Sequence, residues 1–211
     1  MSGGWSVSRA NGRPCYTSAM TSNLDETLKA LWADLVRGAA DKKSPLNRPG
    51  IATVAISGGP ACRTVVLRDV TPSDRSLVFH TDVRSEKVCE LRANPLVAWH
   101  FWNPRANIQI RVSAQAALHH DDATAHDAWS ALHEGSRKTY AQIATPGTAL
   151  TDTNPSGPTQ LSLEDAAQNF VVVATKATAV DWLHLARSGH RRAQWTWDAE
   201  ACRWRGSWVG A

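Results

Sequence analysis

Two short basic segments hold the side chains best suited to binding an anion. The first, RTVVLR at residues 63–68, sets Arg63 and Arg68 among apolar neighbours. A guanidinium in apolar surroundings is costly unless it meets an anion, and it binds phosphate in a two-pronged fork. The segment therefore indicates an anion site, with two solvated arginines at a strand edge as the alternative.

The second segment, TDVRSEK at residues 81–87, joins a predicted strand to the start of a predicted helix. Free backbone N–H groups and the helix dipole favour anions at such a point. Thr81 and Ser85 add hydroxyls, and Arg84 and Lys87 add positive charge. A capped surface helix with solvated charges is the alternative for this segment alone. Two basic clusters on consecutive segments together favour a phosphate site.

Two later segments carry groups that suit a flat ligand. Gln109 and Arg111 share one face of a strand over residues 108–112, where a buried amide would bond to the edge of a polar heterocycle. An outward polar face is the alternative. Trp182 and the cations of HRR at 190–192 suit a planar anion. Nucleic-acid bases also stack on tryptophan, but without a long Lys/Arg run we expect no nucleic-acid partner.

Length and composition indicate the number of domains and the charge of a suitable ligand. The chain has 211 residues, a net charge of +4 and a pI near 9.1, which fits a phosphate-bearing ligand. This length suits one domain. We expect a loose leader over residues 1–21 and a single domain over 22–211, with a low-complexity loop inserted at 145–160.

Several classes of protein are disfavoured by what the sequence lacks. The four cysteines have no CxxC spacing and the eight histidines no HExxH spacing, so no metal site is expected. Scattered cysteines fit reduced thiols in the cytoplasm. No apolar stretch has the length of a signal-peptide core or a membrane span. We therefore expect a cytoplasmic protein that does not contact membranes.

Apolar periodicity and turn signals predict the elements that position these groups. A helix begins after Asn23, a capping residue with Glu26 three positions on, and ends before Pro45. Strands over 51–57 and 62–70 form a hairpin about the turn GGP. On the second strand, Arg63, Val65 and Leu67 should share one face, and Thr64, Val66 and Arg68 should share the other. Further strands are expected at residues 77–81, 97–102, 108–112 running on toward 118, 170–174, 180–185, 191–197 and 203–208. Further helices are expected at residues 85–92, 121–133 and 163–168.

These elements favour a mainly β fold with peripheral helices (α+β), in the form of an antiparallel barrel. Hairpin turns link most of the strands, and helices do not alternate with strands as a parallel sheet requires. No GxGxxG is present, so a dinucleotide site has no support.

The order and spacing of the motifs then resemble a known family. RTVVLR, LVFHT, RSEK, LRANP, NIQIRVSA and WLHL followed by HRR resemble the pyridoxamine 5′-phosphate oxidase-like FMN-binding split barrels, over about residues 51–192. Arg84 before Ser85 resembles the subgroup of oxidase-related FMN-binding proteins. The resemblance implies a six- to eight-stranded split β-barrel, FMN as the cofactor, and a homodimer with FMN at the subunit interface.

The same resemblance implies the residues that bind FMN. They would be Arg63, Thr64, Val65, Val66, Leu67, Arg68, His80, Thr81, Arg84, Ser85, Lys87, Gln109, Trp182 and Arg192. Of these, Lys87 and Ser85 would hold the phosphate and Gln109 would contact the ring system. Trp182 and Arg192 would reach FMN from the other subunit.

Departures from the oxidase pattern bear on the substrate. Glu86 stands where the oxidase has an arginine, and the Tyr-Arg-Ser set that grips its substrate phosphate is replaced by Trp129, His133 and Arg137. The sequence therefore favours an FMN-dependent oxidoreductase acting on an unidentified small molecule, with His190, Arg68 and His133 as the candidates for substrate handling. A true pyridoxamine or pyridoxine 5′-phosphate oxidase, a non-catalytic flavin protein and a haem-binding barrel remain as alternatives.

Overall fold

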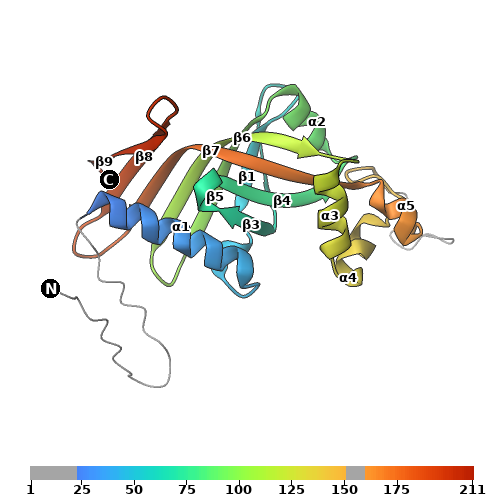
Figure 1. Cartoon of the computed structure of the whole chain (residues 1–211), viewed down its shortest axis with the longest axis horizontal. Helices are drawn as coiled ribbons and strands as arrows, with labels where there is room; N and C mark the ends of the chain where they lie inside the picture. Colours follow the sequence, from blue (N-terminus) through green and yellow to red (C-terminus); the bar gives the residue numbers. More distant parts are fainter. Residues whose placement is uncertain (1–22, 151–159) are drawn as a thin grey trace, which may run out of the picture.

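The computed structural model describes residues 23–150 and 160–211. Within them the chain forms a nine-stranded antiparallel sheet (Figure 1). Its strands follow one another as neighbours in the order β2 (Pro60–Thr64), β1 (Gly50–Val54), β5 (Leu96–Asn103), β6 (Ile108–His119), β7 (Phe170–His184), β4 (Ser76–Asp82) and β3 (Leu67–Thr71), and β8 (Arg191–Asp198) and β9 (Arg203–Val209) extend from β7. The mainly β fold with peripheral helices is therefore confirmed. The leader expected at 1–21 and most of the loop expected at 145–160 lie outside the described residues.

The two edges of the sheet are joined by a strand break that the sequence pattern did not predict. β1 (Gly50–Val54) and β2 (Pro60–Thr64) form the expected hairpin, with Gly58 at a φ of 87° in its turn. The single strand expected at 62–70 is wrong: β2 ends at Thr64 and β3 (Leu67–Thr71) begins on β4 (Ser76–Asp82). β2 and β3 are the two edges of the sheet path, and only two residues join them. The sheet must curl until its edges approach, so Arg63 and Arg68 do not share one alternating strand.

The two longest strands, β6 and β7, are neighbours in the middle of the sheet. β6 (Ile108–His119) lies between β5 (Leu96–Asn103) and β7 (Phe170–His184), which merges the strands expected at 170–174 and 180–185. β7 pairs with β4 near its start, where Thr81 lies opposite Val171, and with β8 near its end. Ten residues of extended chain separate Val171 from Asp181, which is roughly 30 Å.

The last two strands form the expected hairpin at one end of the molecule. β8 (Arg191–Asp198) pairs with β7 and with β9 (Arg203–Val209). Figure 1 shows this hairpin at the end opposite to the helices α3 (Ala123–Ala131), α4 (Glu134–Arg137) and α5 (Leu163–Ala167). Gly206 of β9 lies directly under the buried indole of Trp195, so close that an added Cβ would come within 2.3 Å of the ring.

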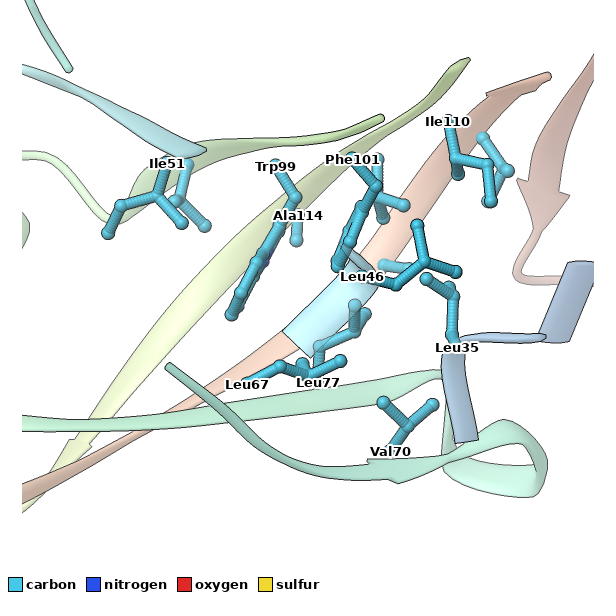
Figure 2. Close-up of a cluster of buried hydrophobic side chains, with 14 of the residues drawn as sticks. Leu35, Leu46, Ile51, Leu67, Val70, Leu77, Trp99, Phe101, Ile110 and Ala114 are labelled. Atoms are coloured by element: carbon cyan, nitrogen blue, oxygen red, sulfur yellow. The ribbon is translucent and has the colours of Figure 1, made fainter. Parts of the chain in front are cut away.

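The main core lies between the curled sheet and the first helix. α1 (Leu24–Ala40) begins as predicted, because Asn23 Oδ1 accepts a hydrogen bond from Asp25 N at 2.8 Å. Its buried stripe, which includes Leu31 and Leu35, packs with Trp99 and Phe101 of β5, whose rings stack 5.7 Å apart. Figure 2 shows Leu35, Trp99 and Phe101 among the other side chains of this cluster.

Shorter helices cover the other end of the sheet. They are α2 (Glu86–Ala93), α3 (Ala123–Ala131), α4 (Glu134–Arg137) and α5 (Leu163–Ala167), and a 3₁₀ turn at Lys138–Tyr140 lies with them. Two further 3₁₀ turns, at Pro45–Asn47 and Pro72–Asp74, lie elsewhere in the fold. A second core cluster forms there around Tyr140 and Phe170, with Trp129 packed against it. Among the described residues, no helix has both the length and the apolar character needed to cross a bilayer.

Candidate functional site

The two basic segments come together at the end of β4 with one carboxylate between them. We call Arg63, Thr81, Ser85, Lys87 and Glu90 the anion cluster. Lys87 Nζ donates to Thr81 Oγ1 at 3.1 Å, and Thr81 Oγ1 lies 3.3 Å from Ser85 Oγ. Ser85 precedes α2 as the predicted N-cap, but its hydroxyl donates to Asp82 O at 2.6 Å instead of capping the helix.

Arg63 is held by a buried carboxylate that the sequence pattern did not single out. Its Nη2 lies 2.8 Å from Glu90 Oε2, and its Nη1 donates to Thr53 Oγ1. Thr53 Oγ1 in turn donates to Glu90 Oε2 at 2.5 Å. Glu90 is 4% exposed, so its charge depends on these two partners. A ligand phosphate therefore meets an Arg63 that already has a counter-charge.

Lys87 is the cation of this cluster that lacks an ion pair. Within the described ranges no carboxylate lies within ion-pairing distance of its ammonium group. Burial, and then the positive charge of Arg63, lower the pKa of Lys87, although Asp82, Glu90 and Glu86 act in the opposite direction. The ammonium group of Lys87 is therefore partly buried beside a second cation and has no ion-paired carboxylate among the described residues, and a bound anion would stabilise it.

Arg84 is committed to local structure. Its guanidinium forms an ion pair with Asp82 at 2.7 Å and donates to the carbonyl oxygens of Gln142 and Ile143. The hydrogen bonds to Asp82 raise the pKa of Arg84. Arg84 therefore connects residues 142 and 143 to the start of α2.

On the opposite face of β4 lies a second group of polar atoms, which we call the Arg68 cluster: Arg68, His80, Tyr140 and Phe170. Arg68 Nε and His80 Nδ1 are buried and have no hydrogen-bond partner among the described residues. Burial and then the charge of Arg68 lower the pKa of His80 to about 4, and burial raises the pKa of Tyr140 to about 12. The His80 ring meets the edge of Phe170 at 4.9 Å between centroids. Arg68, whose Nε lacks a hydrogen-bond partner among the described residues, thus lies near neutral His80 and the ring of Tyr140.

A third group, the Asp181 cluster, lies at the other end of β7. It consists of Arg111, Asp181, Arg192 and Gln194, which come from three adjacent strands. Arg111 and Arg192 each place Nη2 near Asp181 Oδ2, at 2.5 and 2.7 Å. Gln109, on the same face of β6 as Arg111, has its Oε1 3.3 Å from His100 Nε2. Gln109 and Arg111 share one face of β6, as expected, and Arg192, which like Gln109 is paired with Leu183, lies on the same polar face of the sheet.

Trp182 lies on the opposite side of this sheet from Arg192. Trp182 is paired with Ala193, and Leu183 with Arg192, so the two side chains point to different faces. Trp182 is 7% exposed and packs in the main core. Trp208 of β9, whose ring lies 6.3 Å from that of Trp182, is the more exposed indole.

The remaining predicted residues are scattered relative to these clusters. Thr64 is exposed, Val66 half-buried, and Val65 and Leu67 are part of the core. His133 and His190 are both exposed, the first before α4 and the second in the turn between β7 and β8. The expected site is therefore divided within one chain between the anion and Arg68 clusters and the Asp181 cluster, roughly 30 Å away along β7.

Glu90 and Asp181 are functional candidates that the sequence analysis missed. Each is a carboxylate among apolar residues, Glu90 between Val88 and Leu91 and Asp181 between Val180 and Trp182. A carboxylate in such a run is buried only if cations reach it. The position of each carboxylate in an apolar run can be seen in the sequence, but the cations that pair with it cannot be identified there.

Comparison with known proteins supports the resemblance. Residues 29–120 match the family of the pyridoxamine 5′-phosphate oxidase, FMN-binding domain. A pyridoxine/pyridoxamine 5′-phosphate oxidase of Thermosynechococcus vestitus is 42% identical over 66 residues, which is 31% of this chain and 30% of that enzyme. Pyridoxine/pyridoxamine 5′-phosphate oxidase 2 of Arabidopsis thaliana is 27% identical over 167 residues, 74% of this chain and 84% of that one. The dihydrophenazinedicarboxylate synthase of Pseudomonas chlororaphis is 30% identical over 133 residues, 56% of this chain and 59% of that enzyme.

Solved structures share the fold. An oxidase-related, FMN-binding protein of Nostoc punctiforme has a TM-score of 0.70 at 23% identity, covering 87% of this chain and 96% of that one. PhzG of Burkholderia lata, solved in complex with tetrahydrophenazine-1-carboxylic acid, has a TM-score of 0.67 at 17% identity, covering 89% and 92%. The split-barrel fold and the resemblance inferred from the motifs are confirmed.

Proposed function

Because this chain is related in sequence and in fold to the pyridoxamine 5′-phosphate oxidase-like FMN-binding proteins, we propose that it binds FMN and acts as an FMN-dependent oxidoreductase on a small molecule. The observation that carries the proposal is Lys87. Its ammonium group is partly buried beside Arg63 and donates to the Thr81 hydroxyl, and no carboxylate in the described part of the chain forms an ion pair with it. A phosphate dianion would supply the missing negative charge.

The residues present fit such a cofactor. Lys87, Thr81 and Ser85 would bind the phosphate, and Arg63, kept in place by Glu90, would contribute a second cation. Gln109 would bond to the ring system. FMN, when bound, would supply the hydride or electron transfer, while the protein binds and orients it.

A second copy of the chain would complete the site. A single FMN cannot touch both Lys87 and Arg192 of one chain, because roughly 30 Å of β7 separates their clusters. In a homodimer with the partner running in the opposite direction, the Asp181 cluster of one copy would meet the anion cluster of the other. Scattered cysteines suit the reducing cytoplasm as the place where this dimer works.

The Arg68 cluster favours flat, anionic heterocycles as the class of substrate. Arg68 offers an unsatisfied Nε beside the rings of Tyr140, Phe170 and neutral His80, which suits a flat heterocycle bearing a carboxylate or a phosphate. The names of two relatives, a pyridoxamine 5′-phosphate oxidase and a dihydrophenazinedicarboxylate synthase, both describe compounds of that kind. His190 and His133 would lie at the rim of the site, where both are exposed.

The alternative of a true pyridoxamine 5′-phosphate oxidase is supported by the curated relatives of that name. It predicts that hydrogen peroxide and pyridoxal 5′-phosphate form from pyridoxamine 5′-phosphate under air. A screen of B6 vitamers, dihydrophenazine carboxylates and reduced nicotinamides as electron donors, with flavin absorbance as the readout, separates the two proposals.

Purified protein tests the cofactor directly. We expect flavin absorbance as isolated, and acid should release FMN and no FAD. The double variant Arg63→Ala, Lys87→Ala should bind FMN at least about 100-fold more weakly, since it removes two charge-assisted bonds. The matched control Arg105→Ala, Lys138→Ala removes two exposed cations and should bind normally. A colourless protein that takes up no added FMN contradicts the proposal.

A further inference from the structure

Asp181 accepts four hydrogen bonds from three side chains on the neighbouring strands. Arg192 donates through Nε to Oδ1 at 3.1 Å and through Nη2 to Oδ2 at 2.7 Å. Arg111 Nη2 and Gln194 Nε2 donate to the same Oδ2 at 2.5 and 2.8 Å. The donors come from β6 and β8, on both sides of the strand that carries Asp181.

The carboxylate of Asp181 is charged throughout the physiological range. Burial alone would raise its pKa, but the hydrogen bonds from Arg192, Gln194 and Arg111 outweigh that effect and lower the pKa of Asp181 to about 2. One negative charge thus faces two guanidinium groups, and the cluster keeps a net positive charge. An anion can still be attracted to it.

The geometry leaves one end of Arg192 available. Asp181 occupies Nε and Nη2, while Nη1 makes no hydrogen bond to any residue in the described part of the chain. The Arg192 side chain is 28% exposed, so this free end faces solvent. A guanidinium fixed along one edge loses little further freedom when its other end binds a ligand.

We propose that Asp181 is a positioning residue that holds Arg192 in the orientation in which it binds the FMN of a second copy of the chain. The inference rests on the proposed function. Asp181 touches no ligand itself and acts through Arg192. Arg111 and Gln194 keep the carboxylate in place.

Two effects of opposite sign make the proposal testable. Neutralising Asp181 leaves the positive charges of Arg111 and Arg192 without their counter-charge. Electrostatic attraction alone would then tighten the binding of an anionic cofactor. Loss of orientation would weaken it, because Arg192 would have to be immobilised on binding. We expect orientation to dominate in the dimeric protein.

The experiment is a titration of FMN-free protein with FMN, followed by quenching of flavin fluorescence. Asp181→Asn should raise the dissociation constant about tenfold, the range expected for immobilising one long side chain. In an Arg192→Ala background the same substitution should change it less than about twofold, since additivity fails only for residues that act together. Asp181→Glu, which keeps the charge but shifts the carboxylate, should also weaken binding.

A matched control separates positioning from folding. Asp198→Asn removes a carboxylate that is 12% exposed, as Asp181 is, and that pairs with Arg205 on the same two-stranded hairpin. It should leave FMN binding unchanged. Unchanged or tighter binding in both Asp181 variants, or an undiminished effect without Arg192, overturns the positioning role. Failure of the unsubstituted protein to bind FMN would instead overturn the proposed function.

Discussion

Arg63 Nη2 and Glu90 Oε2 lie 2.8 Å apart, and this pair joins the edge strand β2 to helix α2. The Glu90 side chain is almost fully buried, and the Arg63 side chain is 23% exposed. The pair therefore holds the Arg63 guanidinium within the anion cluster. It also connects β2, at the edge of the sheet, to α2.

Glu90→Gln should reduce stability. The substitution leaves Arg63 without its counter-charge in a partly desolvated position, which we expect to cost about 2 kcal/mol of unfolding free energy. Urea unfolding of the FMN-free protein measures the change. Glu86→Gln, an exposed carboxylate one turn earlier on the same helix, should cost less than about 1 kcal/mol. Equal effects of the two substitutions would argue against the importance of the pair.

FMN affinity should fall at alkaline pH because of Lys87. The protonated ammonium binds the phosphate, and burial and Arg63 place the pKa of Lys87 below its ordinary value of 10.5. Affinity should therefore decline as pH rises through that lowered pKa. Lys87→Arg, which stays charged, should retain affinity to higher pH. Fluorescence titrations between pH 7 and 11 compare the two proteins, and superimposable pH profiles would exclude Lys87 as the phosphate ligand.

His80 should make the fold sensitive to acid. Its pKa is about 4 in the folded protein and 6.5 when unperturbed, so the unfolded chain takes up the proton first. The free energy of unfolding should fall as pH drops from 6.5 to 4, by at most about 1.4 kcal/mol per pH unit from this group. His80→Phe should flatten that part of the profile, whereas substitution of the exposed His126 should not. A profile that His80→Phe leaves unchanged would contradict the burial of a neutral imidazole.

Gly206→Ala should destabilise the C-terminal hairpin. The new methyl group would meet the Trp195 indole at 2.3 Å, and that ring is only 2% exposed and cannot easily move. Overpacking of this kind costs about 1–3 kcal/mol. Gly210→Ala, which meets nothing within 4 Å, is the control. Thermal unfolding of the two variants should separate them clearly, and similar midpoints would mean that the ring adapts.

Most elements of the fold could be predicted from the sequence because their signals are local. The Gly58–Gly59 turn, the cap at Asn23 and the alternation around Ile110 each depend on neighbours in the chain. The break at Val65 and Val66 does not. Residues 62–70 read as one apolar strand, and the chain leaves β1 for β4 only because the sheet curls, which is a property of all its strands together.

The candidate site divides in the same way. Lys87, Thr81 and Ser85 lie within one turn and meet as predicted. Glu90 and Asp181 were missed because their partners, Arg63 and Arg192, are 27 and 11 residues away and reach them only across the folded sheet. Opposite placement of Trp182 and Arg192 likewise depends on the pairing register between β7 and β8.

The distance along β7 between the anion cluster and the Asp181 cluster has a genetic consequence. In the symmetric dimer that we propose, each site would take one cluster from each copy, so a chain lacking Lys87 and a chain lacking Arg192 would be defective for different reasons. When the two are expressed together, a mixed dimer contains one site with both defects and one site with none. Two inactive alleles should thus restore activity in the same cell, up to half of that of the normal dimer for each mixed pair.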